Sequence, residues 1–383
     1  MMQLGRNAEA FLLLVGTIVG VGMFGIPFVF ERAGFLTGLV LLVVLAAAAT
    51  LVHLAYAEVV SRTATVHRLP GYARSYLGSP AGWLASASYL FGLSGALLAY
   101  VVLGGSFVGS LVSWVWSNAP VWIGPLGFYL FGVAVIARGI RFEGLADAVL
   151  TIGLIVAIAI LGLTLLPSAS LAGIAAFHPG RLLIPYGVLL FSLAGGAIIP
   201  DLKRVLGPGG LSSLGKIVVA GTLASAGLYL LFAVAVVGAT GGATTPDAVS
   251  GLAEKFGLPY FLLGNVIGVL ATITSFIALG VVLEGMFASD FNMRPFPAWL
   301  LTAVIPAVLF GLGFQDFINI VSIVGAFAIG IDSMLVLAMH RRVSALSTGA
   351  PGAFRVAIPG ALRLLLMALF AAGIVAELAL GIP

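Results

Sequence analysis

The amino-acid sequence predicts an all-α integral membrane protein with eleven transmembrane helices, built from two inverted five-helix repeats and one extra helix. The first observation is composition: of 383 residues, 61% are hydrophobic and only 8% are charged, whereas a soluble domain carries roughly 25% charged residues. The second is that apolar stretches long enough to cross a bilayer, about 20 residues, recur along the whole chain. The third is that glycines interrupt the first and the sixth of these stretches.

The same composition excludes several classes of protein. A chain so poor in charge is not a water-soluble enzyme, a disordered protein or a nucleic-acid binder. The excess of 17 Lys and Arg over 13 Asp and Glu is instead typical of a membrane protein, in which basic residues orient the chain. The sequence contains no cysteine, which excludes disulfides, a thiolate nucleophile and a cysteine-bound metal.

Eleven apolar stretches follow one another in the sequence. They run over 9–33, 36–61, 82–113, 120–138, 144–167, 182–205, 214–239, 260–289, 297–314, 317–339 and 361–380. The third and the eighth are longer than a bilayer requires, so we expect them to be tilted. The first is too long for a cleavable signal peptide and lacks a small-residue cleavage site, so we expect it to be retained. At 69–80 we expect a short helix on the membrane face.

The basic residues orient these stretches. With the N-terminus in the cytoplasm, fourteen of the 17 Lys and Arg fall on inner segments, and the outer segments hold only Arg32, Arg181 and Lys255. The positive-inside rule predicts such an asymmetry, and a missed or an extra span would destroy it. We therefore expect a multi-pass protein of the cell membrane with its N-terminus in the cytoplasm and its C-terminus outside.

The first and sixth stretches differ from the others by glycines in mid-span. The first reads VGTIVGVGMFGIP over 15–27, and the sixth reads FSLAGGAIIP over 191–200. Glycine costs a helix about 1 kcal/mol relative to alanine, and broken backbone persists in lipid only where it lines a cavity. Interrupted helices at matching positions of two repeats mark the binding site of secondary transporters. We favour this interpretation over the alternative, in which the glycines only let helices pack closely.

Two broken helices suit the recognition of a zwitterion such as an amino acid. Free N–H groups at a half-helix N-terminus bind an anion, and free carbonyls at a half-helix C-terminus bind a cation. Tyr100, near the middle of the third stretch, either caps the substrate carboxylate or is an ordinary buried tyrosine. No acid is clearly placed in the pocket, so we expect a neutral substrate. The candidate substrate-binding residues are Gly22, Met23 and Phe24 for the carboxylate, Thr17, Ser192 and Ala194 for the ammonium, and Gly20, Tyr100, Gly195 and Gly196 for the rest of the pocket.

These motifs resemble those of a known family. The segment GTIVGVGMFGIP at 16–27 resembles the opening motif of the amino acid/polyamine/organocation superfamily, most closely that of the hydroxy/aromatic amino acid permeases and the auxin-permease-like amino acid transporters. YAE at 56–58, LPGY at 69–72 and TSF at 274–276 are also similar to that superfamily. SLAGGAII at 192–199 resembles the unwound segment of sodium symporters of the leucine-transporter type.

The resemblance covers spans one to ten and implies a fold. It implies the inverted-repeat fold of those transporters, with repeats over 1–167 and 181–342 and an additional helix in 361–383. Relatives carry larger residues where this chain has Gly195 and Gly196. The resemblance therefore implies room for a medium or large side chain on the substrate, and we expect an aromatic or branched one.

The eighth stretch carries a candidate cation site. Ala271, Thr274 and Ser275 share one helix face, so a carbonyl and two hydroxyls would present oxygen ligands to a small cation. The resemblance implies that this face meets the carbonyls of Gly16 and Val19, as in sodium-coupled relatives. In the alternative, both hydroxyls bond to carbonyls of their own helix. We favour sodium coupling; proton coupling remains the alternative, because hydroxy/aromatic permeases are viewed as proton-driven.

Ionisable side chains inside a membrane are candidates for function. The apolar stretches contain His53, Glu58, Glu284 and Asp332. Glu58 precedes Arg62 by one helical turn, which favours a structural ion pair. Glu284 and Asp332 either pair at an inner gate with Lys203 or Arg204, which we favour, or carry a coupled proton. We expect His53 to be a hydrogen-bonded packing residue.

The sequence thus predicts a secondary active transporter of a neutral amino acid that works by alternating access. The expected partners are the amino acid, the bilayer and sodium as coupling ion, with no cofactor, nucleotide or nucleic acid. The GLSG string at 92–95 matches a motif of intramembrane serine proteases, with His53 as the only intramembrane base, and we keep this enzyme as a remote alternative. A divalent-metal transporter would need acidic, amide or sulfur ligands at both breaks, and Met23 alone does not supply them. A channel would need a charged ring or a filter sequence, and we find neither in the sequence.

Overall fold

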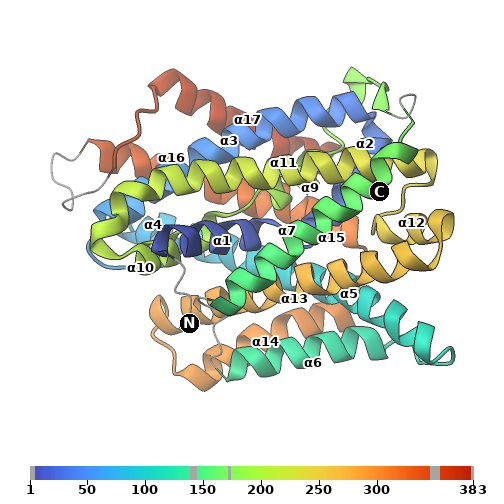
Figure 1. Ribbon diagram of the computed structural model, residues 1–383. Coiled ribbons are helices and arrows are strands. Elements are labelled where there is room, and N and C mark those ends of the chain that lie inside the picture. Colours follow the sequence, from blue (N-terminus) through green and yellow to red (C-terminus); the bar gives the residue numbers. More distant parts are fainter. Residues whose placement is uncertain (1–4, 139–144, 171–173, 346–353, 381–383) are drawn as a thin grey trace.

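The computed structural model describes residues 5–138, 145–170, 174–345 and 354–380. Helices follow one another through these ranges, and many of them run the length of the molecule (Figure 1). They are α1 (Arg6–Ile18), α2 (Gly22–Ala33), α3 (Phe35–Arg62), α4 (Leu69–Leu77), α5 (Ser79–Val115), α6 (Ile123–Ala137), α7 (Leu145–Leu165), α9 (Tyr186–Ser192), α10 (Ile199–Gly210), α11 (Leu214–Thr240), α12 (Val249–Phe256), α13 (Leu258–Ser289), α14 (Pro295–Gly311), α15 (Phe317–Ile323), α16 (Gly330–Ser344) and α17 (Gly360–Leu380).

The predicted class, an all-helical membrane protein, is confirmed. In the described ranges, seven segments are long and apolar enough to cross a membrane, and the bent pair α1 and α2 makes an eighth. One of the seven, Tyr186–Ala243, covers most of the predicted span at 182–205 and all of the one at 214–239. The apolar helices α6 and α14 fall where two more spans were predicted, but they have only 15 and 17 residues.

Small residues bring the long helices close together. Helix α5 has 37 residues and packs against α13, which has 32. On another side α5 meets α6, where a Cβ on Gly124 would lie 2.4 Å from the carbonyl oxygen of Gly105. Such an approach leaves no room for a side chain and is typical of helix contacts inside membranes.

The outer surface of the molecule is apolar. Large hydrophobic side chains are exposed on α3, α6 and α17, as expected for helices that face lipid. Trp114 at the end of α5, and Trp116 and Trp122 in the connection to α6, are all exposed, where tryptophans of an interfacial belt would lie. The helix expected in 69–80 is confirmed as α4. We refer to the end of the molecule that carries α4 as the α4 end.

Candidate functional site

The first predicted break lies between α1 and α2. Helix α1 ends at Ile18, α2 begins at Gly22, and the two are bent by 51°. The N–H groups of Met23 and Phe24 donate to the carbonyls of Gly20 and Val21, at 3.3 and 3.2 Å. The expectation that these two amides bind a carboxylate is therefore wrong, because the first turn of α2 already uses them. In the described part of the chain, the Gly22 N–H has no protein acceptor.

The second break separates α9 from α10. Helix α9 ends at Ser192, and a 3₁₀ turn at Gly196–Ile198 leads into α10. Inside the break, the Gly195 N–H donates to Nε2 of His53 at 3.1 Å. Because Nε2 accepts, the ring proton lies on Nδ1, which donates to Oγ1 of Thr222 at 3.1 Å. His53 is thus a hydrogen-bonded support of the break rather than a free base.

The two breaks touch each other. A Cβ on Gly22 would lie 2.4 Å from Oγ of Ser192 and 2.9 Å from its Cα, so only glycine fits there. From α11, the hydroxyl of Tyr229 lies 2.5 Å from the carbonyl oxygen of Ile18 and 2.8 Å from that of Ser192. The carbonyls that end α1 and α9 therefore share one hydroxyl, and the Ser192 carbonyl is not free as the sequence suggested.

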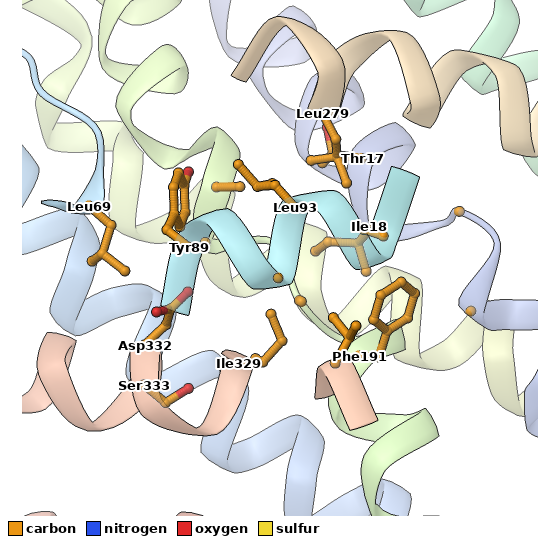
Figure 2. A pocket seen from close by; sticks show the side chains of 18 of the residues that line it. Thr17, Ile18, Leu69, Tyr89, Leu93, Phe191, Leu279, Ile329, Asp332 and Ser333 are labelled. Atoms are coloured by element: carbon orange, nitrogen blue, oxygen red, sulfur yellow. The ribbon is translucent and has the colours of Figure 1, made fainter. Parts of the chain in front are cut away.

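A cavity lies between the breaks, α5 and α16 (Figure 2). Of the predicted substrate-binding residues, seven line it: Thr17, Gly20, Gly22, Tyr100, Ser192, Ala194 and Gly196. Met23, Phe24 and Gly195 do not. The side chains of Met23 and Phe24 are fully buried, and Phe24 stacks on Phe107 with ring centroids 4.9 Å apart. The α-carbon of Gly195 faces Ile18, since a Cβ there would lie 2.8 Å from that side chain.

Tyr100 lies at the first break. Its hydroxyl hydrogen-bonds the side chain of Ser275 and the backbone of Val21. A Cβ on Gly20 would lie 2.5 Å from the same hydroxyl. Tyr100 therefore supports the unwound backbone and also lines the cavity.

The candidate cation residues lie beside this break but point in different directions. Oγ of Ser275 donates to the Gly16 carbonyl at 3.2 Å, which links α13 to α1. Oγ1 of Thr274 donates to the carbonyl of Leu270 at 2.9 Å and lies 3.4 Å from that of Ala271, within its own helix. For Thr274 the structure thus shows the alternative, in which the hydroxyl bonds to carbonyls of its own helix. Val19, whose carbonyl was a candidate ligand, directly follows the end of α1 and is fully buried.

Helix α7 adds a hydroxyl that the sequence did not suggest. Oγ1 of Thr151 would lie 2.4 Å from a Cβ on Gly16. It therefore lies against the same stretch of α1 as Ser275. No local pattern in span five distinguishes this threonine from one that faces lipid.

The three intramembrane acids have separate environments. Glu58 is buried and accepts hydrogen bonds from Arg62 at 2.9 Å and from His340 at 3.1 Å, so it ties α3 to α16. Glu284 lines a second cavity at the α4 end, together with Arg68 and Arg204.

Asp332 lies elsewhere than expected. It lines the main cavity (Figure 2), so the inference that no acid reaches the pocket is wrong. The expected gate partners are engaged with other groups: Lys203 donates to the Val60 carbonyl at 3.0 Å, and Arg204 donates to Asp201 at 2.9 Å. Only the fold brings the first turn of α16, which carries Asp332, to the wall of the cavity.

An ion pair lies next to the main cavity at the α4 end. Arg68 pairs with Asp201 at the start of α10, and their side chains are 7% and 16% exposed. Leu69 lines the main cavity and Arg68 lines the second one, so the pair lies between the two. Burial alone would lower the pKa of Arg68, but the Asp201 carboxylate raises that pKa above its usual value.

Sequence reasoning also missed Asp201, Tyr229 and Glu377. Asp201 directly follows the second break in IIPD, and this position was the available signal. Tyr229 and Glu377 each stand alone in an apolar helix, with no spacing that indicates a role. Glu377 of α17 accepts a hydrogen bond from Ser322 at 3.1 Å.

The chain is similar to known membrane transporters. The model of the tryptophan/tyrosine permease family matches residues 7–378. Glutamine transporter 2 of Aliivibrio fischeri is 21% identical over 336 residues, which cover 86% of this chain and 87% of that protein. The crystal structure of MhsT in complex with L-phenylalanine superposes with a TM-score of 0.69 over 99% of both chains, at 17% identity. This last likeness identifies the fold as that of the leucine-transporter type.

Proposed function

The chain belongs to the tryptophan/tyrosine permease family, and we propose that it moves an aromatic amino acid across the membrane by sodium-coupled symport. The observation that carries the proposal is the cavity between two broken helices that touch at Gly22 and Ser192. At its wall the Gly22 N–H is free for a carboxylate, as a half-helix N-terminus requires. L-phenylalanine in MhsT supports an aromatic substrate.

Membership of a transporter family contradicts the protease alternative. The geometry gives the reason, because His53 bonds to Gly195 and Thr222 and so is not available to activate Ser94. A catalytic pair needs the base within hydrogen-bond reach of the nucleophile.

We further propose eleven crossings, with the α4 end in the cytoplasm. The short helices α6 and α14 supply the fourth and ninth, and the 58-residue segment Tyr186–Ala243 supplies two. Fourteen of 17 basic residues then lie inside, in line with the positive-inside rule. Repeats over 1–167 and 181–342 would each begin with a broken span, and spans 1, 2, 6 and 7 would rock against the others.

Uptake into proteoliposomes tests the function. We expect labelled tryptophan to accumulate under an inward sodium gradient and not in a potassium control at the same pH on both sides. Accumulation that ignores sodium but rises with an acidic exterior would assign the coupling to protons, the alternative that Asp332 in the cavity wall favours. Failure to move any aromatic amino acid would contradict the proposed function itself.

The sodium site is tested by a double substitution. Thr274→Ala with Ser275→Ala removes the hydroxyl that reaches α1 and the neighbouring hydroxyl, which would have to turn one of its lone pairs to the ion. We therefore expect sodium to lose its effect on uptake while tryptophan exchange without a gradient persists. Thr272→Ala is the matched control, because Thr272 lies on the same helix and donates to the Gly268 carbonyl at 2.7 Å. Unchanged sodium dependence in the double variant would refute the assignment.

A further inference from the structure

Three polar groups without partners gather at one end of the main cavity. Tyr56 of α3, Tyr89 of α5 and Asp332 of α16 all line it. Within the described residues, the two tyrosine hydroxyls and Oδ1 of Asp332 are buried without a hydrogen-bond partner. Tyr89 is close enough to interact electrostatically with both Tyr56 and Asp332. Buried polar groups are normally paired, so three orphans from three helices in one place indicate a site for a ligand.

The position of this cluster defines which part of a ligand reaches it. In Figure 2, Asp332 and Tyr89 lie at one end of the cavity, and Ile18 and Phe191 lie at the other, next to the two breaks. Apolar side chains, among them Leu93, form the wall between these ends. On the proposed function, an amino acid whose carboxylate lies at the breaks would extend its side chain along this wall.

The chemistry of the cluster points to a hydrogen-bond donor on the ring. Asp332 can accept, and each tyrosine hydroxyl can accept or donate. Tryptophan carries an indole N–H and tyrosine a phenol O–H, whereas phenylalanine carries no ring donor. We propose that Asp332, with Tyr89 and Tyr56, binds the donor on the ring of the substrate and so selects tryptophan and tyrosine over phenylalanine. This inference rests on the proposed function.

The cluster fits a neutral donor better than a metal cation. Among the described residues, no group of three or more His, Asp and Glu side chains could hold a metal ion. Asp332 is a single carboxylate, and the neighbouring Ser88 hydroxyl donates to the Ala328 carbonyl at 3.1 Å. One carboxylate beside two phenols provides few of the six or more oxygens that a hard cation prefers.

The test compares tryptophan with an analogue that lacks the donor. In 3-benzothienylalanine a sulfur atom replaces the indole N–H at nearly constant shape. We would measure how each compound competes with labelled tryptophan in exchange across proteoliposomes without ion gradients, so that coupling plays no part. For the wild-type protein we expect tryptophan to bind about 10- to 100-fold more tightly than the analogue, the range for a hydrogen bond to a charged group.

Variants assign this preference to Asp332. In Asp332→Leu we expect tryptophan to lose its advantage while the analogue binds as before; in Asp332→Asn, which keeps an acceptor oxygen, part of the advantage remains. Glu377→Gln is the control, since it alters a buried acid outside the cavity, and we expect the wild-type ratio. Equal binding of the two compounds to the wild type would overturn the proposal. So would variants that keep the ratio and lose only gradient-driven accumulation, which would make Asp332 a proton carrier. If the wild type binds neither compound, the proposed function has failed instead.

Discussion

Replacing Gly22 with alanine is expected to abolish transport. The added Cβ would lie 2.4 Å from Oγ of Ser192 and 2.9 Å from Cδ1 of Phe191, closer than atoms in folded proteins approach. A third neighbour, the Cα of Ser192, belongs to the backbone. A side-chain rotation cannot relieve that contact, so the two breaks would have to move apart. Overpacking of this kind costs about 1–3 kcal/mol, and displaced binding groups reduce the rate by about 100-fold. Initial rates of tryptophan uptake at matched protein levels measure the effect.

A second glycine provides the control for that substitution. Gly127 on α6 has open space where a Cβ would be, and alanine favours the helix by about 1 kcal/mol. We expect Gly127→Ala to transport as the wild type does. Wild-type uptake by Gly22→Ala would show that the breaks do not need their close contact.

Replacing Asp201 with asparagine is expected to open the α4 end. Arg68, 7% exposed, would lose the carboxylate that balances its charge, and removing one partner of a buried ion pair costs about 3–5 kcal/mol. The closed arrangement would lose that stabilisation. The open arrangement would lose less, because there Arg68 can reach water. We expect gradient-driven accumulation to fall sharply while exchange of tryptophan persists.

Cysteine labelling measures this opening directly. The chain has no cysteine of its own, so Leu69→Cys places a single thiol in the cavity wall behind the ion pair. A membrane-impermeant maleimide applied at the α4 end should react faster when Asp201→Asn is present. Arg204→Ala is the control: Arg204 pairs with the same carboxylate but is 44% exposed, and exposed pairs contribute little. Equal labelling rates in all three proteins would contradict a gate at Arg68 and Asp201.

Local chemistry explains what the sequence could predict. Glycines at 16, 20, 22 and 195–196 weaken a helix wherever they occur. Both breaks were therefore recognisable from the local sequence, without knowledge of the helices that pack against them. Hydropathy is a property of each span by itself, so it predicted the apolar stretches without knowledge of their packing. The basic residues between the spans predicted their orientation. The pairing of Glu58 with Arg62 depends on one helical turn and was equally accessible.

Features that depend on how helices rotate against each other were not predictable. Thr274 and Ser275 are neighbours, yet one hydroxyl bonds to its own helix and the other reaches α1. Asp332 reaches the cavity only because α16 packs beside α5. The amides of Met23 and Phe24 were misassigned because the first turn of α2 tightens and uses them. Each of these outcomes is decided by packing over long sequence distances.

The hydroxyl of Tyr229 has a mechanical consequence for the transport cycle. Its one hydrogen is shared between the carbonyls of Ile18 and Ser192. The hydroxyl therefore links the ends of α1 and α9 to each other and to α11. If either half-helix swung alone, a carbonyl would be stranded in a dry interior at a cost of about 1–3 kcal/mol. On the proposed alternating access we therefore expect the two halves to turn together, so that neither break opens without the other.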